Sequence, residues 1–312
     1  DLEKPGFNAF NTAFMSDGAY IRLAPGTVLE QPVHLLFIAT GRPDTVATVR
    51  NLIVAEAGSK AQIIESYVSL NDAAYMTSTV TELITGDGAD IEHYKLEQES
   101  ESAYHMAGIY VSQHRDSRYT SHNIAFGGRL VRNDLQVMLD GPGADCTLNG
   151  LYLTRGRQHV DNHTRIDHCK PRSSSREFYK GVLDGHSRAI FNGRVVVHTD
   201  AQQTDARQSN HNLLLSNEAE ADAQPQLEIH ADDVKCSHGC TVGRLDEEAL
   251  FYLRSRAIDA VTARNFLIHA FAADVLQRIR IAPVRRHLEA QLTGRLYGGK
   301  RPDMYMNQEG VA

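Results

Sequence analysis

The sequence contains no tryptophan, few cysteines and no long apolar run. Its four cysteines among 312 residues are too few for a disulfide-stabilised scaffold of this length. They favour a reducing compartment, so we expect a cytoplasmic protein. No apolar run approaches the roughly 18 residues of a membrane-spanning helix, and the longest, residues 35–39, has the length of a strand. We therefore expect no membrane partner.

The chain also lacks a basic excess and the common nucleotide-binding motifs. It has 32 basic and 39 acidic residues, a net charge of −7, which disfavours a nucleic-acid binder. No Gly-x-x-x-x-Gly-Lys-Ser/Thr pattern is present, and no Gly-x-Gly-x-x-Gly stands between a strand and a helix. If ATP is used, another subunit binds it.

Between about residues 18 and 243 the chain alternates short apolar strands with turns. The strands are rich in Val, Ile, Thr and Tyr and are bounded by Gly, Asp and Asn; examples are 51–56, 62–69, 77–85, 91–96, 135–139, 189–198 and 226–230. A similar turn recurs at 57–61, 86–90 and 141–145. Recurring strands and corners favour a solenoid over a sandwich, although the interval is not constant. In 189–198, Phe191, Val195 and Val197 form an apolar face, and His198 should point outward.

The flanking segments differ from this pattern. Residues 1–17 show no periodicity and are expected to be a loop or the remnant of a longer segment. After Gly243, Asp246 is a plausible N-cap of a helix through about Arg256, Asp259 caps a second helix, and Pro283 fits the first turn of a third. These helices, within 244–296, could cover the open end of a solenoid. Residues 297–312 are polar and predict a flexible tail.

The segment from 227 to 243 carries the most distinctive side chains. It places Cys236, His238 and Cys240 at two-residue spacing, which puts them on one face of an extended strand. A thiolate and an imidazole suit iron or zinc. A closed structural site needs about four ligands, so further ligands must come from elsewhere in the chain or from a partner. The alternative is a buried thiol beside a solvated imidazole.

These residues stand within a longer resemblance. The strings HVDNHT (159–164), DGHSRAIFNG (184–193), TDA (204–206), NLLL (212–215), PQLEI (225–229), LDEE (245–248) and FYLRSR (251–256) follow in order. Together they resemble the SufB/SufD family of iron–sulfur cluster assembly proteins, over residues from about 15 to 295. The string DVKCSHG (233–239) favours the SufD branch of that family.

The resemblance implies a mainly β fold, with a right-handed parallel β-helix core over 18–243 and a C-terminal α-helical subdomain over 244–296. It implies a non-catalytic scaffold of the SUF system that pairs with SufB through the β-helix and docks the ATPase SufC through the helices. Candidate docking residues are Asp246, Tyr252, Arg254 and Arg256. No cofactor is then bound tightly by the chain alone.

The same resemblance assigns roles to the cysteine–histidine segment. His238, with Cys236 beside it, would contribute to a transient iron–sulfur cluster at the SufB interface. Cys240 departs from the small residue usual in the family; it could add a ligand, but a packing role is the simpler interpretation.

A second group comprises His159, His163, His168 and Cys169. If the segment is a strand, His159, Asp161 and His163 share one side. A metal site is one interpretation, but we favour a structural or interface role. The string 184–187 contains Asp, His and Ser, yet adjacency does not make a catalytic triad, and we interpret it as a turn.

Two other classes of protein stay open. One is a β-helix enzyme acting on polysaccharide, for which Asp87, Asp90 and Arg129 could lie along a groove, although the tryptophan platforms common in sugar sites are missing. The other is a homodimeric structural protein, and a homodimer of the isolated chain is also compatible with the scaffold hypothesis.

Overall fold

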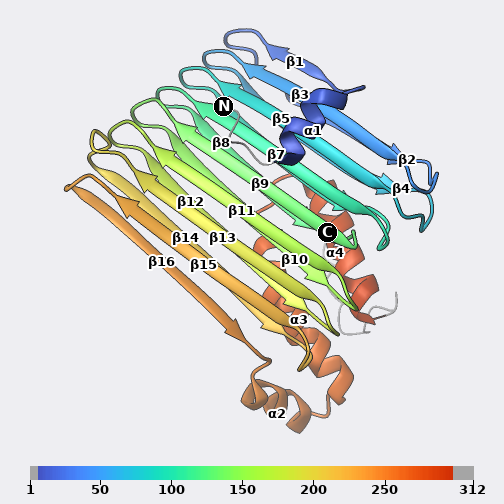
Figure 1. The fold of residues 1–312 in the computed structure, drawn as a ribbon. Helices are drawn as coiled ribbons and strands as arrows, with labels where there is room; N and C mark the ends of the chain where they lie inside the picture. Colours follow the sequence, from blue (N-terminus) through green and yellow to red (C-terminus); the bar gives the residue numbers. More distant parts are fainter. Residues whose placement is uncertain (1–5, 298–312) are drawn as a thin grey trace, which may run out of the picture.

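The chain folds as a parallel β-helix, which confirms the expected fold class. The computed structural model describes residues 6–297. The strands form two eight-stranded parallel sheets that face each other (Figure 1). Sheet A contains β1 (Tyr20–Leu23), β3 (Val46–Ala55), β5 (Met76–Thr85), β7 (Tyr104–Gln113), β9 (Leu130–Leu139), β11 (His159–His168), β13 (Arg188–Val197) and β15 (Glu220–Ile229). Sheet B contains β2 (Val33–Ala39), β4 (Lys60–Ser69), β6 (Asp90–Gln98), β8 (Arg118–Ala125), β10 (Asp145–Thr154), β12 (Ser174–Leu183), β14 (Thr204–Leu214) and β16 (Val234–Gly243).

The corners between the sheets stack on one another as the strands do. The amides of Gly26, Gly58 and Gly88 each donate to a carbonyl of the next corner, all at 2.8 Å. Each of these glycines has a φ between 66° and 71°, in the left-handed region that favours glycine. Further along the solenoid, Asp116 and Arg172 take the corresponding position, with φ of 55° and 58°. The corner geometry therefore repeats although the sequence of the corners does not. For this reason the sequence shows no constant repeat.

The interior alternates with the outer faces along every strand. Phe191, Val195 and Val197 of β13 lie in the core between the sheets and are 1% exposed or less. His198 lies outside, where its Nε2 is 3.2 Å from Oδ1 of Asp167. Both predictions for this strand are confirmed.

The C-terminal helices do not cover the open end of the solenoid. They are α2 (Glu247–Ser255), α3 (Ala260–Leu276) and α4 (Ala282–Tyr297), and the side chains of Asp246 and Asp259 cap α2 and α3 as expected. Apolar side chains of α3 and α4 form one buried cluster with the outer face of sheet B; its members include Ile268, Leu276, Leu288, Phe126, Leu151 and Val182. The helices therefore cover a side of the solenoid, because that face of sheet B carries apolar residues where sheet A carries charged ones.

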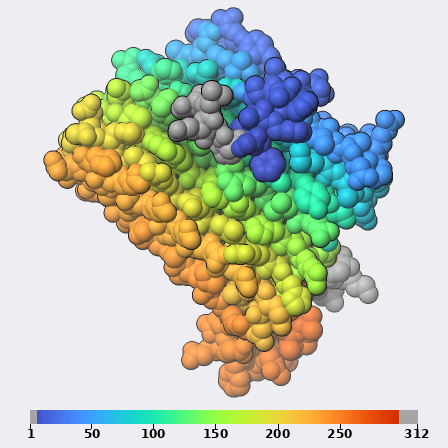
Figure 2. All heavy atoms as spheres, viewed as in Figure 1, coloured from blue at the N-terminus to red at the C-terminus, as the bar shows by residue number. Residues whose placement is uncertain are grey.

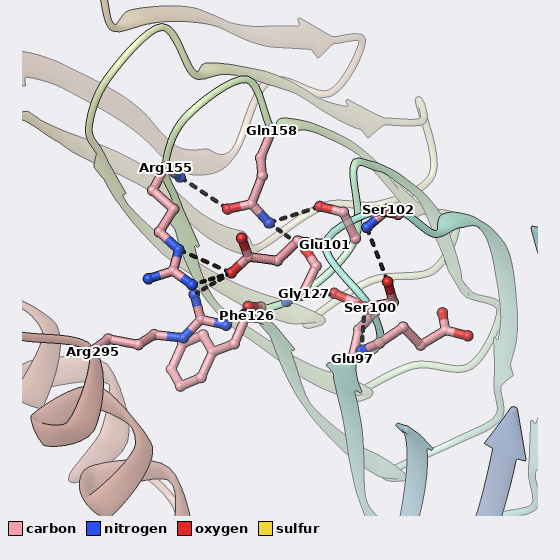
Figure 3. A network of polar contacts seen from close by, with 11 residues as sticks. Glu97, Ser100, Glu101, Ser102, Phe126, Gly127, Arg155, Gln158 and Arg295 are labelled. Atoms are coloured by element: carbon pink, nitrogen blue, oxygen red, sulfur yellow. Dashed lines mark hydrogen bonds and ion pairs between the residues drawn. The ribbon is translucent and has the colours of Figure 1, made fainter. Parts of the chain in front are cut away.

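The end of α4 is held at a corner of the solenoid by polar contacts (Figure 3). The guanidinium of Arg295 donates to the carbonyl of Phe126 and lies 5.8 Å from the centre of its ring. Arg155 donates from Nε to Glu101 Oε1 at 2.9 Å, and Arg295 lies 3.8 Å from the same oxygen. The three charged side chains line a polar cleft of about 660 Å³. These contacts fix the helical layer on the β-helix.

The N-terminal segment, expected to be a loop or the remnant of a longer segment, contains a helix. Residues Gly6–Phe14 form α1, which packs on β3 and β5 of sheet A, on the opposite side from α3 and α4 (Figure 1). The buried amide of Asn11 donates to the carbonyls of Val49 and Ser78, both at 2.9 Å. The spacing of Phe7, Phe10 and Phe14 along one side of the helix was the available signal, although the one buried side chain of α1 is the polar Asn11. The tail expected over 297–312 lies outside the described residues except for Tyr297, the last residue of α4.

Ionisable side chains occupy the interior at the N-terminal half of the solenoid. Glu65 Oε1 lies 3.2 Å from His93 Nε2, and Glu99 Oε2 lies 2.7 Å from His105 Nδ1, with all four side chains buried. Burial acts to raise the pKa of Glu65, but its hydrogen bonds, chiefly from His93, outweigh that effect and lower the pKa to about 2. The inside of this β-helix is thus polar in places rather than uniformly apolar.

Glu177 on β12 is a different case, because its hydrogen-bond partner is an amide. Gln208 Nε2 donates to Glu177 Oε2 at 2.6 Å, and both residues are buried. Burial raises the pKa of Glu177 to about 7, and the bond from Gln208 only partly offsets the effect.

Replacing Glu177 by glutamine should change how stability depends on pH. A raised pKa in the folded state means that wild-type stability falls as pH rises from about 4.5 to about 7 and is then level. The variant lacks that loss, so its stability relative to wild type should grow by up to about 3 kcal/mol across this window. Denaturant unfolding at pH 5, 6, 7 and 8 measures it; a pH-independent difference would contradict the assignment.

Candidate functional site

The candidate site lies on β16, the last strand of sheet B. Among the described residues β16 pairs only with β14, so its other edge is free. Figure 1 shows β16 running along the border of the solenoid toward α2. The other edge strand of sheet B, β2 at the far end, is shorter, with seven residues against the ten of β16. The longest free strand edge of sheet B therefore belongs to the cysteine–histidine segment.

Register decides which way its side chains point. Cys236, His238 and Cys240 pair with Ala206, Gln208 and Asn210 of β14, and these three β14 residues are buried. Parallel strands in register place paired side chains on the same side of the sheet. The cysteines and the histidine therefore belong to the inward-facing rows of the solenoid, at its open end. The expectation that they share one face is confirmed.

Their exposure increases along the strand. Cys236 is half-buried and packs against the core, and burial raises the pKa of its thiol. His238 and Cys240 are exposed. In the part of the chain that the structure describes, no three His, Cys, Asp or Glu side chains are arranged to hold a metal ion. Cys236, His238 and Cys240 thus form a line of potential ligands and not an enclosed site.

The outward face of β16 is small and polar. It carries Lys235, Ser237, Gly239, Thr241 and Gly243, all exposed. Charged side chains and prolines on an edge strand prevent edge-to-edge pairing. Of these residues only Lys235 is charged, and none is proline. Another strand can approach this edge closely.

The predicted docking residues lie on or beside α2, which has no buried residue. Asp246 caps the helix, and the Arg256 guanidinium lies 4.5 Å from the centre of the Tyr252 ring. Arg254 is exposed in the last turn. Sequence reasoning missed Phe251, whose side chain is 74% exposed beside Tyr252 at 56%. Adjacent aromatic residues on a helix of low overall hydropathy were the available signal. In Figure 2, α2 projects beyond the solenoid at the end of the chain's last strands.

The second histidine group is divided between two sides of sheet A. His163 lies on the outer face of β11, with Nε2 2.9 Å from Asp161 Oδ1, and Arg132 lies 2.6 Å from the other oxygen of that carboxylate. His168 points inward, between the hydroxyls of Ser173 and Ser175, and burial lowers its pKa to about 4. Cys169 follows in the adjacent turn. His168 therefore cannot share a metal with His159 and His163, and the favoured structural role agrees with these contacts.

The remaining candidates are not gathered into a site either. Residues 184–187 form a turn, with Gly185 at φ 67°, as expected. Asp87 pairs with Arg115 and Asp90 with Lys60 at one set of corners, whereas Arg129 precedes β9 at the opposite set. The groove required by the polysaccharide-enzyme hypothesis is not formed by these three residues. None of the helices in the described chain is both long and apolar enough to cross a membrane.

The four thiols should differ in reactivity toward a maleimide added to the native protein. Cys240 is exposed and should react first. Cys169 and Cys236 are half-buried, the pKa of each thiol is raised, and both should react more slowly. Cys146 is fully buried, burial raises its pKa, and it should react only on unfolding. Mass spectrometry of peptides over time gives the order, and early labelling of Cys146 would contradict the burial described here.

Comparison with known proteins agrees with this architecture. A family model described as the SufBD core domain of the SUF system for FeS cluster assembly matches residues 37–271. Similar proteins include the iron–sulfur cluster assembly protein SufD of Escherichia coli, 35% identical over 86% of this chain, and a SufBD family protein of Synechocystis, 34% identical over 90%. The chloroplastic protein ABCI7 of Arabidopsis thaliana is 32% identical over 93%. The chain spans 63–64% of the length of these relatives. With three quarters of its residues matched by that model, the chain belongs to the SufBD family of iron–sulfur cluster assembly proteins.

Proposed function

We propose that this chain is a non-catalytic scaffold subunit that pairs with SufB along β16 and docks the ATPase SufC through α2. The iron–sulfur cluster is its cargo, assembled at the SufB junction with His238 and Cys236 among the contributing groups. The observation that carries the proposal is the position of these two side chains on a long free strand edge.

The edge supports pairing because its backbone groups lack a neighbour on one side. A ten-residue strand presents a row of donors and acceptors that a second strand can satisfy. The small outward side chains of Ser237, Gly239 and Thr241 allow close approach. The companion strand β15 ends sheet A beside it, so both sheets can continue into a partner of the same architecture.

The ligand set supports assembly rather than storage of a cluster. One half-buried thiol and one exposed imidazole offer two donors suited to iron. Completion by SufB groups would make the cluster form only in the complex. Incomplete ligation by each subunit also favours release of the cluster, which an assembly scaffold requires.

The α2 surface supports docking of a protein. It exposes Phe251 and Tyr252 next to the acidic first turn at Glu247 and Glu248, and these residues line a shallow depression. Exposed aromatic residues are enriched at interfaces. Because β16 leads into α2 through a short link, ATP-driven movement of SufC subunits could be transmitted directly to the SufB junction.

Anaerobic co-expression with SufB and SufC from the same organism tests the cluster role. His238→Ala should lower iron and sulfide in the purified complex several-fold while leaving its subunit stoichiometry unchanged. Because the side chain is exposed, the stability of the variant should stay within about 0.5 kcal/mol of wild type.

The matched control is His230→Ala, which removes another exposed imidazole at the same end of the solenoid. It should leave the cluster content unchanged. Equal losses in both variants, or no complex at all with the wild-type chain, would contradict the proposal.

The docking role has a separate test. Phe251→Ser should weaken binding of SufC by roughly 5- to 30-fold, since a central aromatic contact commonly contributes about 1–2 kcal/mol. Leu70→Ser is the control, because Leu70 is 70% exposed on a distant corner. Calorimetry with purified SufC measures both affinities; a loss with Leu70→Ser and none with Phe251→Ser would exclude α2 as the docking surface.

A further inference from the structure

One inward-facing row of sheet B leads from the interior directly to His238. Glu177 of β12 pairs in register with Gln208 of β14, and Gln208 pairs with His238 of β16. Adjacent strands are about 4.8 Å apart, so the row places a carboxyl group, an amide and an imidazole in sequence. Glu177 and Gln208 are 3% and 2% exposed, whereas His238 lies at the open end.

The amide of Gln208 is oriented by its inner neighbour. Its Nε2 donates to Oε2 of Glu177 at 2.6 Å, and a carboxylate there accepts only from the NH₂ side of the amide. The other amide atom, Oε1, is buried and has no hydrogen-bond partner among the described residues. An unsatisfied buried carbonyl oxygen destabilises the fold, so a donor beside it is favoured.

The opposite sheet is shaped to accept this amide. Gly193 of β13 lies across from Gln208, and a Cβ built on Gly193 would be 2.1 Å from Gln208 Nε2 and 2.9 Å from its Cδ. Only glycine therefore leaves room for the amide in its present place. Gly193 does not have a positive φ, so its backbone conformation does not require glycine. Its structural role is to leave room for the amide of Gln208.

We propose that Glu177 and Gln208 are positioning residues for His238. In the structure this oxygen is unpaired, and no hydrogen bond or ion pair to a described residue holds the exposed imidazole of His238. The imidazole turns so that one ring nitrogen donates to Gln208 Oε1, which fixes the tautomer and leaves the lone pair of the other nitrogen for the iron of the cargo. Histidine ligands in proteins usually donate their second ring N–H to an acceptor of this kind. The proposal rests on the proposed cluster role of His238. It adds two buried residues that lie outside the sequence motifs described above.

The test uses the full chain labelled with ¹⁵N-histidine at pH 8, where an ordinary imidazole is neutral. Long-range ¹⁵N–¹H spectra report the tautomer of His238, assigned from the signals missing in His238→Ala. Wild type should show one dominant tautomer. Gln208→Met removes the acceptor at similar volume and should shift His238 to the mixture of tautomers of a solvated imidazole.

Two further variants separate positioning from folding. Gly193→Ala leaves all three residues of the row unchanged, but its Cβ would lie 2.1 Å from Gln208 Nε2 and 2.9 Å from Phe191 Cε1. By displacing the amide it should shift the tautomer as Gln208→Met does. Asn210→Leu alters the neighbouring buried amide on β14, in the row of Cys240, and should leave the His238 signals unchanged. Thermal unfolding confirms that each variant is folded.

In the complex with SufB and SufC, Gln208→Met should weaken iron binding about 10- to 100-fold, as loss of a histidine's supporting partner commonly does. An unchanged tautomer in Gln208→Met would overturn the positioning role even if His238→Ala loses the cluster. A second outcome is a fixed tautomer that depends on Gln208, with a cluster content that His238→Ala does not change. That result would support the positioning role of Gln208 but reject the cluster role of His238.

Discussion

Strand-on-strand hydrogen bonding in exact register is the constraint on which this molecule depends. Each turn of the solenoid satisfies the backbone of the previous one and leaves its own outer edge unsatisfied. Every inward side chain also stacks above the same position of the next turn, as Glu177, Gln208 and His238 do. An open edge and continuous rows of side chains leading to it are therefore consequences of a single arrangement. The chemistry at β16 cannot be separated from the interior that supports it.

The two outer faces show how the same sheet geometry serves different surroundings. Sheet B is apolar outside and binds α3 and α4, with Arg295 fixing the end of the helical layer. Sheet A instead carries ion pairs such as Arg132 with Asp161 and Arg194 with Glu228. Helices therefore cover one side of the solenoid, and paired charges lie along the other, while α2 exposes Phe251 and Tyr252 and β16 presents a free strand edge.

The sequence was sufficient for the strands, the helix caps and the shared face of Cys236, His238 and Cys240, because alternation and capping are local signals. It was insufficient where the determinants are distant. Glycine, aspartate and arginine occupy equivalent corner positions, so the repeat has no constant sequence pattern. Asn11 holds α1 through contacts 38 and 67 residues away. The row behind His238 joins residues about 30 positions apart, and only strand register brings Gln208 next to His238.

Hydrogen–deuterium exchange of the chain alone and with SufB tests the central claim that β16 is the pairing edge. The account predicts that peptides covering 220–243 become strongly protected on addition of SufB, while those covering β1 and β2 do not change. Protection confined to β1 and β2, with exchange at 234–243 unaltered, would contradict it, since the cysteine–histidine strand would then remain unpaired in the complex.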